Sequence, residues 1–320
     1  MSLFKTVKRA AVRLLAGNNA LLKHMIRNQY KEGHPFKALA LAVMTSPVRS
    51  AVKLGDNMHV FTFTVSKNYY SELQKLLHIA KVEGFELVRT GREHDGGYIL
   101  LDDFHAGDVA YSFGISDDVS WDKEMASRGY DIFMYDHTID ALPEENARFH
   151  WSKLGISDET THDDRLKTLD ELIKANHHED KHNMILKMDV EGAEWGFLEQ
   201  VSSETLSQFS QMSFEFHGIP SHKNPDLVLE VFRKINRTHQ LVHIHANNCG
   251  NYISFGHKNF CELLELSYVL RGKYTFCDNY DVNLPLNIDE VNIPSLPEIP
   301  LGRWNEDAEI GERVTAHRAL

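Results

Sequence analysis

Residues 109–136, VAYSFGISDDVSWDKEMASRGYDIFMYD, contain the pattern that decides the fold of this chain. We expect an apolar strand over 109–113, a turn at Gly114, a helix to about residue 128, and a second apolar strand that ends at Asp136. This order is the first half of a nucleotide-binding α/β unit, in which a turn glycine lets the backbone approach the ligand. An acid about 20 residues later holds the ribose hydroxyls, and the spacing from Gly114 to Asp136 is 22 residues.

The glycine-rich motifs that hold a pyrophosphate or a triphosphate are absent, since the chain has neither G-x-G-x-x-G nor G-x-x-x-x-G-K-S/T. An adenosine ligand without phosphate fits better, and S-adenosylmethionine is such a ligand. We expect Gly114 and Ser116 to cradle its methionine and sugar parts at a helix N-terminus. Asp136 would accept both ribose hydroxyls, and either His137 or Thr138 would line the adenosine pocket. The structural alternatives, a plain turn glycine and a capping acid, do not explain the spacing between the two.

The bulk composition is that of a globular protein, with 42% hydrophobic and 25% charged residues among 320. That length suits one α/β domain of about 200–250 residues and an appendage. The three cysteines show no C-x-x-C spacing, so neither a disulfide framework nor a zinc ribbon is indicated. No signal peptide is evident, and no apolar run reaches the roughly 18 residues of a membrane span. We therefore expect a cytoplasmic protein.

The net charge of −12 is unevenly distributed along the chain. Residues 1–53 carry ten basic residues and one acid, whereas the remainder carries 24 basic and 45 acidic residues. An acidic body is a poor nucleic-acid binder, because neutralising phosphates requires clustered cations. Residues 3–27 resemble a basic amphipathic helix, which would either touch the inner face of a membrane or pack on the body or on another subunit of a homo-oligomer.

Beyond residue 109 the chain alternates between strand and helix patterns, which predicts a parallel sheet with both faces covered. We expect seven strands in a Rossmann-like sheet, the last one antiparallel, and a division into a helical extension (1–56), the α/β domain (57–272) and a C-terminal lid or tail (273–320). The expected strands are 109–114, 131–136, 149–156, 184–190, 211–217, 240–246 and 262–270, and the expected helices lie near 120–128, 163–176, 194–200 and 224–237.

Five segments of the chain resemble the FkbM-like S-adenosylmethionine-dependent methyltransferases, in particular a branch with a D-G-G-Y turn. These segments are R-E-H-D-G-G-Y (92–98), Y-S-F-G-I-S (111–116), Y-D (135–136), L-K-M-D-V-E-G-A-E-W (186–195) and F-E-F-H-G (214–218). The resemblance covers roughly residues 85–270 and departs from the family at the first turn, where a richer G-x-G is usual. It implies an O-methyltransferase of the EC 2.1.1 class that acts on a sugar hydroxyl in a glycan or a secondary metabolite.

The resemblance alone places Asp95, Gly96, Gly97 and Tyr98 in the cofactor pocket. Taken by themselves, D-G and G-G dipeptides only predict a tight turn between two short strands.

A set of acids and histidines follows the carboxyl ends of the predicted strands, where open α/β sheets bind ligands. Asp189 and Glu191 end the fourth strand, Glu215 and His217 alternate with two phenylalanines, and His245 belongs to a later strand. Either a carboxylate or histidine acts as general base, or Asp189, Glu215, His217 and His245 hold a divalent metal ion. A satisfied polar network is the structural alternative. For Glu194 we expect only the stabilisation of an acid near a helix N-terminus.

Two other functions compete with this hypothesis. An NAD-linked sugar oxidoreductase is disfavoured by the lone Gly114 and by the lack of a Y-x-x-x-K pair after the fourth strand. A catalytically silent scaffold would dock on an anionic membrane or a partner through residues 1–53. The presence of Asp136, Asp189, Glu215 and His217 argues against a dead site.

Overall fold

The computed structural model describes residues 52–53, 59–60, 67–156, 164–255, 258–277, 280–306 and 314–317. The chain divides into two compact units. The first consists of Met1–Glu72 with Pro220–Pro225, and the second of Leu73–Ile219 with Asp226–Leu320. The basic segment predicted over residues 3–27 lies outside the described residues. The seven-stranded sheet belongs to the second unit.

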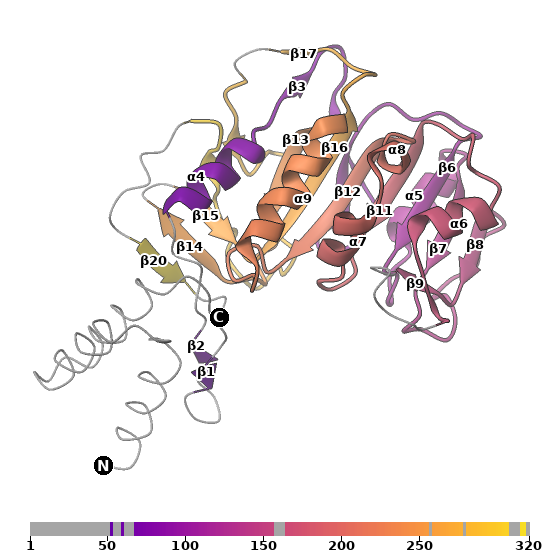
Figure 1. Cartoon of the computed structure of the whole chain (residues 1–320), viewed down its shortest axis with the longest axis horizontal. Helices are drawn as coiled ribbons and strands as arrows, with labels where there is room; N and C mark the ends of the chain where they lie inside the picture. Colours follow the sequence, from indigo (N-terminus) through magenta and orange to yellow (C-terminus); the bar gives the residue numbers. More distant parts are fainter. Residues whose placement is uncertain are drawn as a thin grey trace, which may run out of the picture. The chain divides into compact units, whose positions relative to one another are not determined.

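The second unit is built on a seven-stranded sheet in the order β13-β16-β12-β11-β6-β7-β8 (Figure 1). Strands β12, β11, β6, β7 and β8 run parallel, and β16 is antiparallel to both β12 and β13. The bounds are β6 Val109–Phe113, β7 Asp131–Tyr135, β8 Phe149–Ser152, β11 Met184–Met188, β12 Phe209–His217, β13 His239–Ala246 and β16 Leu263–Leu270. The expected seven-stranded sheet with one antiparallel final strand is therefore confirmed.

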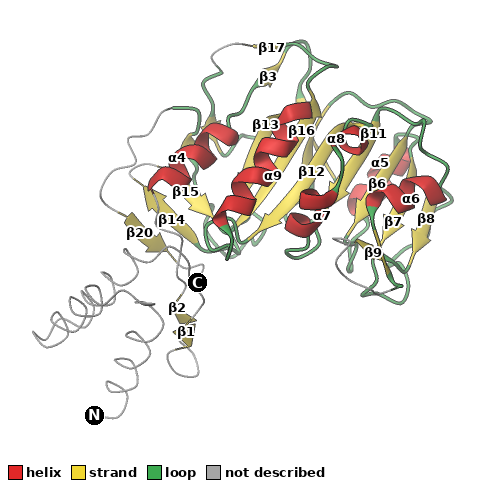
Figure 2. Ribbon diagram, viewed as in Figure 1, coloured by secondary structure: helices red, strands yellow, loops and turns green. Residues whose placement is uncertain are grey.

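Helices cover both faces of this sheet, as expected for a Rossmann-like fold. Helices α6, α7 and α9 lie on one face (Figure 2), where Trp195 of α7 and Phe232 of α9 pack on Phe216 of β12. Helix α5 packs on the other face, in a core that joins Trp121 and Met125 to the small and apolar side chains of β6 and β7. The helices are α4 Lys67–Leu76, α5 Ser120–Ser127, α6 Leu169–Ala175, α7 Glu194–Gln200, α8 Ser203–Leu206 and α9 Pro225–Thr238.

The region after β7 differs from expectation. The strand predicted over 149–156 is split into β8 and a short β9 (Gly155–Ile156), which pairs with β10 (Leu166–Lys167). Helix α6 accordingly starts at Leu169 rather than near residue 163, because Thr168 and Glu171 form a reciprocal capping box at its N-terminus. The capping pair was present in the sequence and gives the better boundary.

A hairpin formed by β4 (Leu87–Thr90) and β5 (Tyr98–Leu101) packs on the α5 face of the sheet. Gln211 of β12 fixes it, since its side-chain amide accepts from the Leu101 N–H at 2.8 Å and donates to the Leu101 carbonyl at 3.0 Å. The remaining strands are β1 Val52–Lys53, β2 His59–Val60, β3 Lys81–Val82, β14 Tyr252–Phe255, β15 Lys258–Cys261, β17 Phe276–Cys277, β18 Asn283–Leu284, β19 Gly302–Arg303 and β20 Val314–His317.

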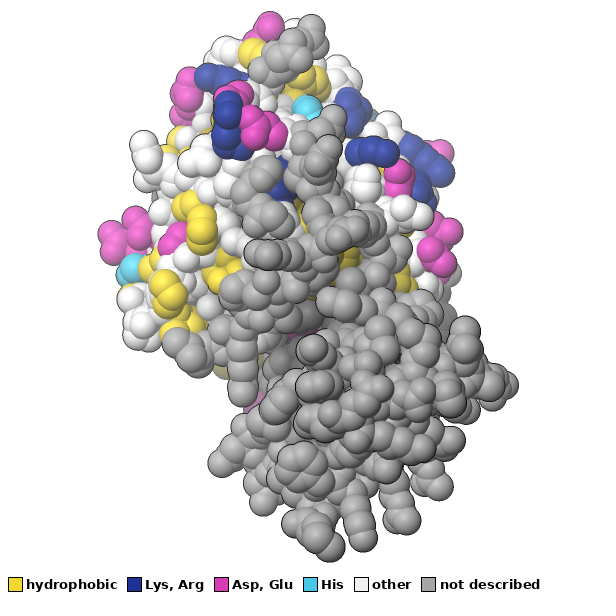
Figure 3. All heavy atoms as spheres, turned by 90° about the vertical axis from the view of Figure 1, so that its left-hand side faces the viewer, with side chains coloured by type: hydrophobic (Ala, Val, Ile, Leu, Met, Phe, Trp, Pro, Cys, Tyr) yellow, Lys and Arg dark blue, Asp and Glu magenta, His cyan; other side chains and the backbone are white. Residues whose placement is uncertain are grey.

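On the face shown in Figure 3, the acidic and basic side chains of the described residues are interspersed, and hydrophobic side chains occur in small groups. Among the described residues, no helix combines the length and the apolar character that crossing a bilayer requires.

The carboxyl ends of β6 and β11 approach each other closely at Gly114. A Cβ atom added to Gly114 would lie 1.6 Å from the carbonyl oxygen of Asp189, and the residue has a φ of +75°. Both facts require glycine, because any side chain would collide with backbone and L residues rarely adopt this conformation. The turn glycine of the sequence pattern is thus fixed by strand packing.

We expect Gly114→Ala to lower the free energy of unfolding by at least about 3 kcal/mol. This figure combines backbone strain of about 1–2 kcal/mol with the cost of the steric clash. Gly84→Ala is the matched control, since Gly84 has a φ of +78° but nothing within 4 Å of the added carbon. That variant should lose only the strain contribution. Urea unfolding of both proteins measures the difference, and equal losses would show that the close approach is unimportant.

Candidate active site

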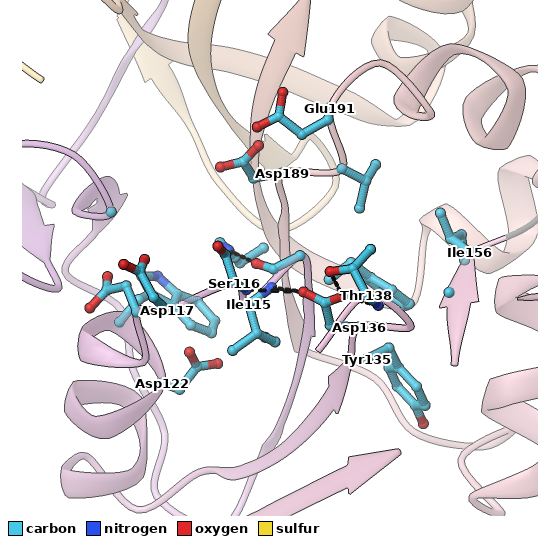
Figure 4. Close-up of a pocket in the computed structure, with 18 of the residues that line it drawn as sticks. Ile115, Ser116, Asp117, Asp122, Tyr135, Asp136, Thr138, Ile156, Asp189 and Glu191 are labelled. Carbon is cyan, nitrogen blue, oxygen red and sulfur yellow. Dashed lines mark hydrogen bonds between the residues drawn. The ribbon is translucent and has the colours of Figure 1, made fainter. Parts of the chain in front are cut away.

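A cavity of about 330 Å³ opens at the carboxyl ends of β6, β7 and β11, the position at which open α/β sheets bind ligands (Figure 4). Its wall is formed by the turn after β6, by the start of α5, by the segment after β7 and by the segment after β11. The predicted site residues that line it are Asp95, Gly96, Tyr98, Gly114, Ser116, Asp136, His137, Thr138, Asp189 and Glu191. Predictions from four separate segments therefore converge on one cavity.

Asp136 organises the turn beneath the cavity. One carboxylate oxygen accepts hydrogen bonds from the N–H groups of Ile115 and Ser116 at 2.9 and 3.0 Å, and the other accepts from the N–H and hydroxyl of Thr138 at 2.7 and 2.6 Å. Burial alone would raise the pKa of Asp136, but these hydrogen bonds lower it below its usual value. Asp136 is thus an ionised acceptor beside the cavity, with each oxygen already shared with the protein.

The D-G-G-Y turn closes one side of the cavity, and its members differ in role. Gly96 lies against Asp118, since a Cβ atom there would be 2.3 Å from a carboxylate oxygen of that residue. Gly97 does not line the cavity and instead packs on the carbonyl oxygen of Arg92, 2.2 Å from its ideal Cβ position. The Tyr98 hydroxyl donates to Asp189 at 3.0 Å and so joins the turn to the end of β11.

Acidic side chains dominate the cavity wall. Two side chains of fixed positive charge line it, Arg92 and Lys187, and at the rim the Arg92 guanidinium lies 3.5 Å from Asp118. The seven lining carboxylates belong to Asp95, Asp117, Asp118, Asp122, Asp136, Asp189 and Glu191. Such a wall repels phosphates and suits a ligand that carries positive charge.

Asp189, Glu191 and His217 come together beside the cavity. One ligand atom of each lies within 4.8 Å of the other two, and Figure 4 shows the carboxylates of Asp189 and Glu191 next to each other. The Nε2 atom of His217 is 3.3 Å from Glu191 and 3.5 Å from Glu215. A histidine between carboxylates suits either proton transfer or the binding of a divalent cation.

Glu194 controls the state of His217. It is fully buried, and its Oε1 atom lies 3.2 Å from Nδ1 of His217 while also accepting from the N–H groups of Val190 and Gly192. Burial lowers the pKa of His217, but the bond to Glu194 and the nearby carboxylates raise it to about 9. Glu194 is therefore more than an acid stabilised by a helix N-terminus.

Glu215 lies deeper, on the same face of the sheet as Tyr98. It accepts from the side-chain amide of Asn247 at 3.3 Å, and burial together with the charges of Asp189 and Glu265 raises its pKa well above the usual value. Its carboxyl group lies 3.5 Å from Nε2 of His217, and Glu215 does not line the cavity itself.

His245, one of the predicted metal ligands, belongs to a separate buried cluster. Its two ring nitrogens lie 3.1 Å from Glu265 and 3.4 Å from Glu298. Burial lowers the pKa of His245, but these two carboxylates raise it to about 10. The structure therefore groups Asp189 and His217 with Glu191, and not with His245.

Sequence reasoning assigned no role to several residues of the cavity wall. Asp122 and Lys187 carry opposite charges and are almost fully buried, and Gly155 and Ile156 form the wall opposite the turn. Lys187 was visible in the K-M-D-V-E-G-A-E-W segment, whereas nothing in the helix pattern around Asp122 marks that residue as facing a cavity.

Comparison with known proteins identifies the family of the chain. The family model of the methyltransferase FkbM domain matches residues 42–251. No curated protein matches the chain. A solved structure named "Putative hemolysin from Streptococcus thermophilus" aligns at 9% identity over 55% of this chain and 71% of that one, with a TM-score of 0.26, which establishes no shared fold. Because the family model covers most of the chain and includes the cavity, the protein belongs to the FkbM methyltransferase domain family.

Proposed function

We propose that this methyltransferase uses S-adenosylmethionine to methylate a hydroxyl group of a sugar, in a glycan or a secondary metabolite. The observation that carries the proposal is the acid-lined cavity at the ends of β6, β7 and β11, with Asp136 at its base. The bound cofactor supplies a methyl group on a positively charged sulfonium, which an acidic wall tolerates and a pyrophosphate-binding site does not favour. The sugar acceptor is an expectation that rests on the family resemblance.

The chain's own residues would bind the cofactor, orient the acceptor and take up the proton of its hydroxyl group. Each oxygen of Asp136 already accepts two hydrogen bonds, so a ribose hydroxyl would bind it in place of a Thr138 donor. Tyr135, His137 and Ile156 line the cavity and would contact the adenine. The acceptor hydroxyl would approach over Asp189 and Glu191, next to His217. Its proton would pass to His217 as the methyl group is transferred, and the alignment of donor and acceptor supplies most of the rate.

Titration with S-adenosylhomocysteine tests the cofactor assignment. We expect micromolar binding to the wild type and at least about tenfold weaker binding to Asp136→Ala, since charged hydrogen bonds contribute about 1.5–3 kcal/mol. Asp131→Asn, at the opposite end of β7, is the control and should bind normally. Failure of a folded wild-type protein to bind would overturn the proposal.

The pH dependence of methyl transfer tests the base. A protonated His217 cannot accept a proton, so kcat/KM should rise with pH through about 9, the pKa of this histidine. Glu194→Gln removes a carboxylate that favours the imidazolium, and the rise should therefore shift to lower pH. NMR titration of His217 and rates with a sugar acceptor measure the shift. Glu199→Gln on the same helix should leave the profile unchanged, and a profile insensitive to Glu194→Gln would remove His217 as the base.

A divalent metal ion is the second candidate for activating the hydroxyl, because Asp189, Glu191 and His217 offer three ligand atoms within 4.8 Å of one another. A bound ion would lower the pKa of the acceptor hydroxyl. Treatment with a chelator separates the two candidates. Activity that survives EDTA supports His217 as the base. If EDTA abolishes activity, if Mg²⁺ or Mn²⁺ restores it, and if neither ion restores it in Glu191→Gln, the result supports the metal.

A further inference from the structure

The inner wall of the cavity contains two buried side chains of opposite charge. Asp122, in the first turn of α5, is 1% exposed, and Lys187, near the end of β11, is 7% exposed. Both line the cavity. The Lys187 ammonium donates one hydrogen bond to the Gly114 carbonyl, which leaves two of its protons for other acceptors.

Asp122 lacks a partner for one of its oxygens. Its Oδ1 atom is buried and has no partner at ordinary hydrogen-bond geometry among the described residues, and the nearby Ser112 hydroxyl is itself buried without such a partner. Burial raises the pKa of Asp122 to about 6, and the nearby Lys187 ammonium and Ser112 hydroxyl offset the burial in part. A buried carboxylate oxygen without a hydrogen-bond donor is costly. A cationic group that enters the cavity would supply the hydrogen-bond donor that this oxygen lacks.

We propose that Asp122 and Lys187 form a zwitterion site for the amino-acid end of the cofactor, with Asp122 binding the ammonium and Lys187 the carboxylate. The inference rests on the proposed function and extends it. It also accounts for the departure from G-x-G at the first turn, because a buried charge pair replaces backbone N–H groups as the anchor of the methionine end.

The other charge pair at the cavity is less suitable for this role. Arg92 and Asp118 lie at the rim, 3.5 Å from each other, with 45% and 20% of their side chains exposed. Asp118 also accepts from the N–H and the hydroxyl of Ser120 at 3.1 and 2.8 Å. Both rim groups thus have partners within the protein and are screened by water, whereas Asp122 has an open acceptor in a buried position.

Three ligands separate the two halves of the zwitterion site by calorimetry. S-adenosylhomocysteine carries both charged groups, decarboxylated S-adenosylmethionine lacks the carboxylate, and 5′-methylthioadenosine lacks both. We expect Asp122→Asn to weaken the binding of the first two ligands by about 10- to 100-fold, the range of a charged hydrogen bond. The affinity for 5′-methylthioadenosine should stay within about twofold of the wild-type value. Lys187→Met should weaken the binding of S-adenosylhomocysteine more than that of the decarboxylated ligand, which has no carboxylate to lose. Asp180→Asn, an exposed acid outside the cavity, is the matched control.

Thermal unfolding of the ligand-free variant distinguishes binding from a structural role. Asparagine is isosteric and neutral, so Asp122→Asn should keep or raise the Tm at pH 7.5, where the wild type holds an ionised buried oxygen without a partner. A lower Tm together with equal weakening of all three ligands would overturn the zwitterion site and make Asp122 structural. Equal affinity of the wild type for S-adenosylhomocysteine and 5′-methylthioadenosine would also overturn it. Failure of the wild type to bind any of the three would instead reject the proposed function.

Discussion

The contact between the ends of β6 and β11 is the constraint on which the site depends. The carbonyl oxygen of Asp189 occupies the space that any side chain at position 114 would need. Because the strands meet so closely, the turn after β6 and the segment after β11 form one continuous wall. The Lys187 ammonium reinforces it by donating to the Gly114 carbonyl. Close packing at one backbone atom therefore brings the turn after β6 and the acidic segment after β11 to the same cavity.

The sequence predicted the sheet better than it predicted the partners of polar side chains. Strand positions follow from local apolar runs, which are short-range information. The hydrogen-bond partners of Asp136 do not follow from local sequence, since its carboxylate accepts from backbone N–H groups 20 and 21 residues away. Glu194 shows the same limit, because its position near a helix N-terminus explained its charge without revealing the bond to His217. His245 lies on a strand as expected, yet its ring nitrogens contact Glu265 and Glu298 rather than the predicted partners Asp189 and His217.

Charge is organised in layers away from the cavity. Exposed or partly exposed acids lie at its mouth, and the more deeply buried Glu215 and Glu265 carboxylates lie behind them on neighbouring strands. Burial and mutual repulsion raise the pKa of Glu215, whereas carboxylates on both ring nitrogens raise that of His217. The two shifts have opposite physical causes, although the side chains are 3.5 Å apart.

The four hydrogen bonds that Asp136 accepts have a consequence for the kinetics of ligand capture. The turn at Ile115 and Ser116 is fastened to the adjacent strand within the protein itself. The conformational entropy of ordering this turn is therefore lost when the chain folds, and does not have to be lost again when a ligand arrives. A receptor of this kind meets its ligand in a ready shape, so that association is limited by diffusion into the cavity instead of by rearrangement of the loop.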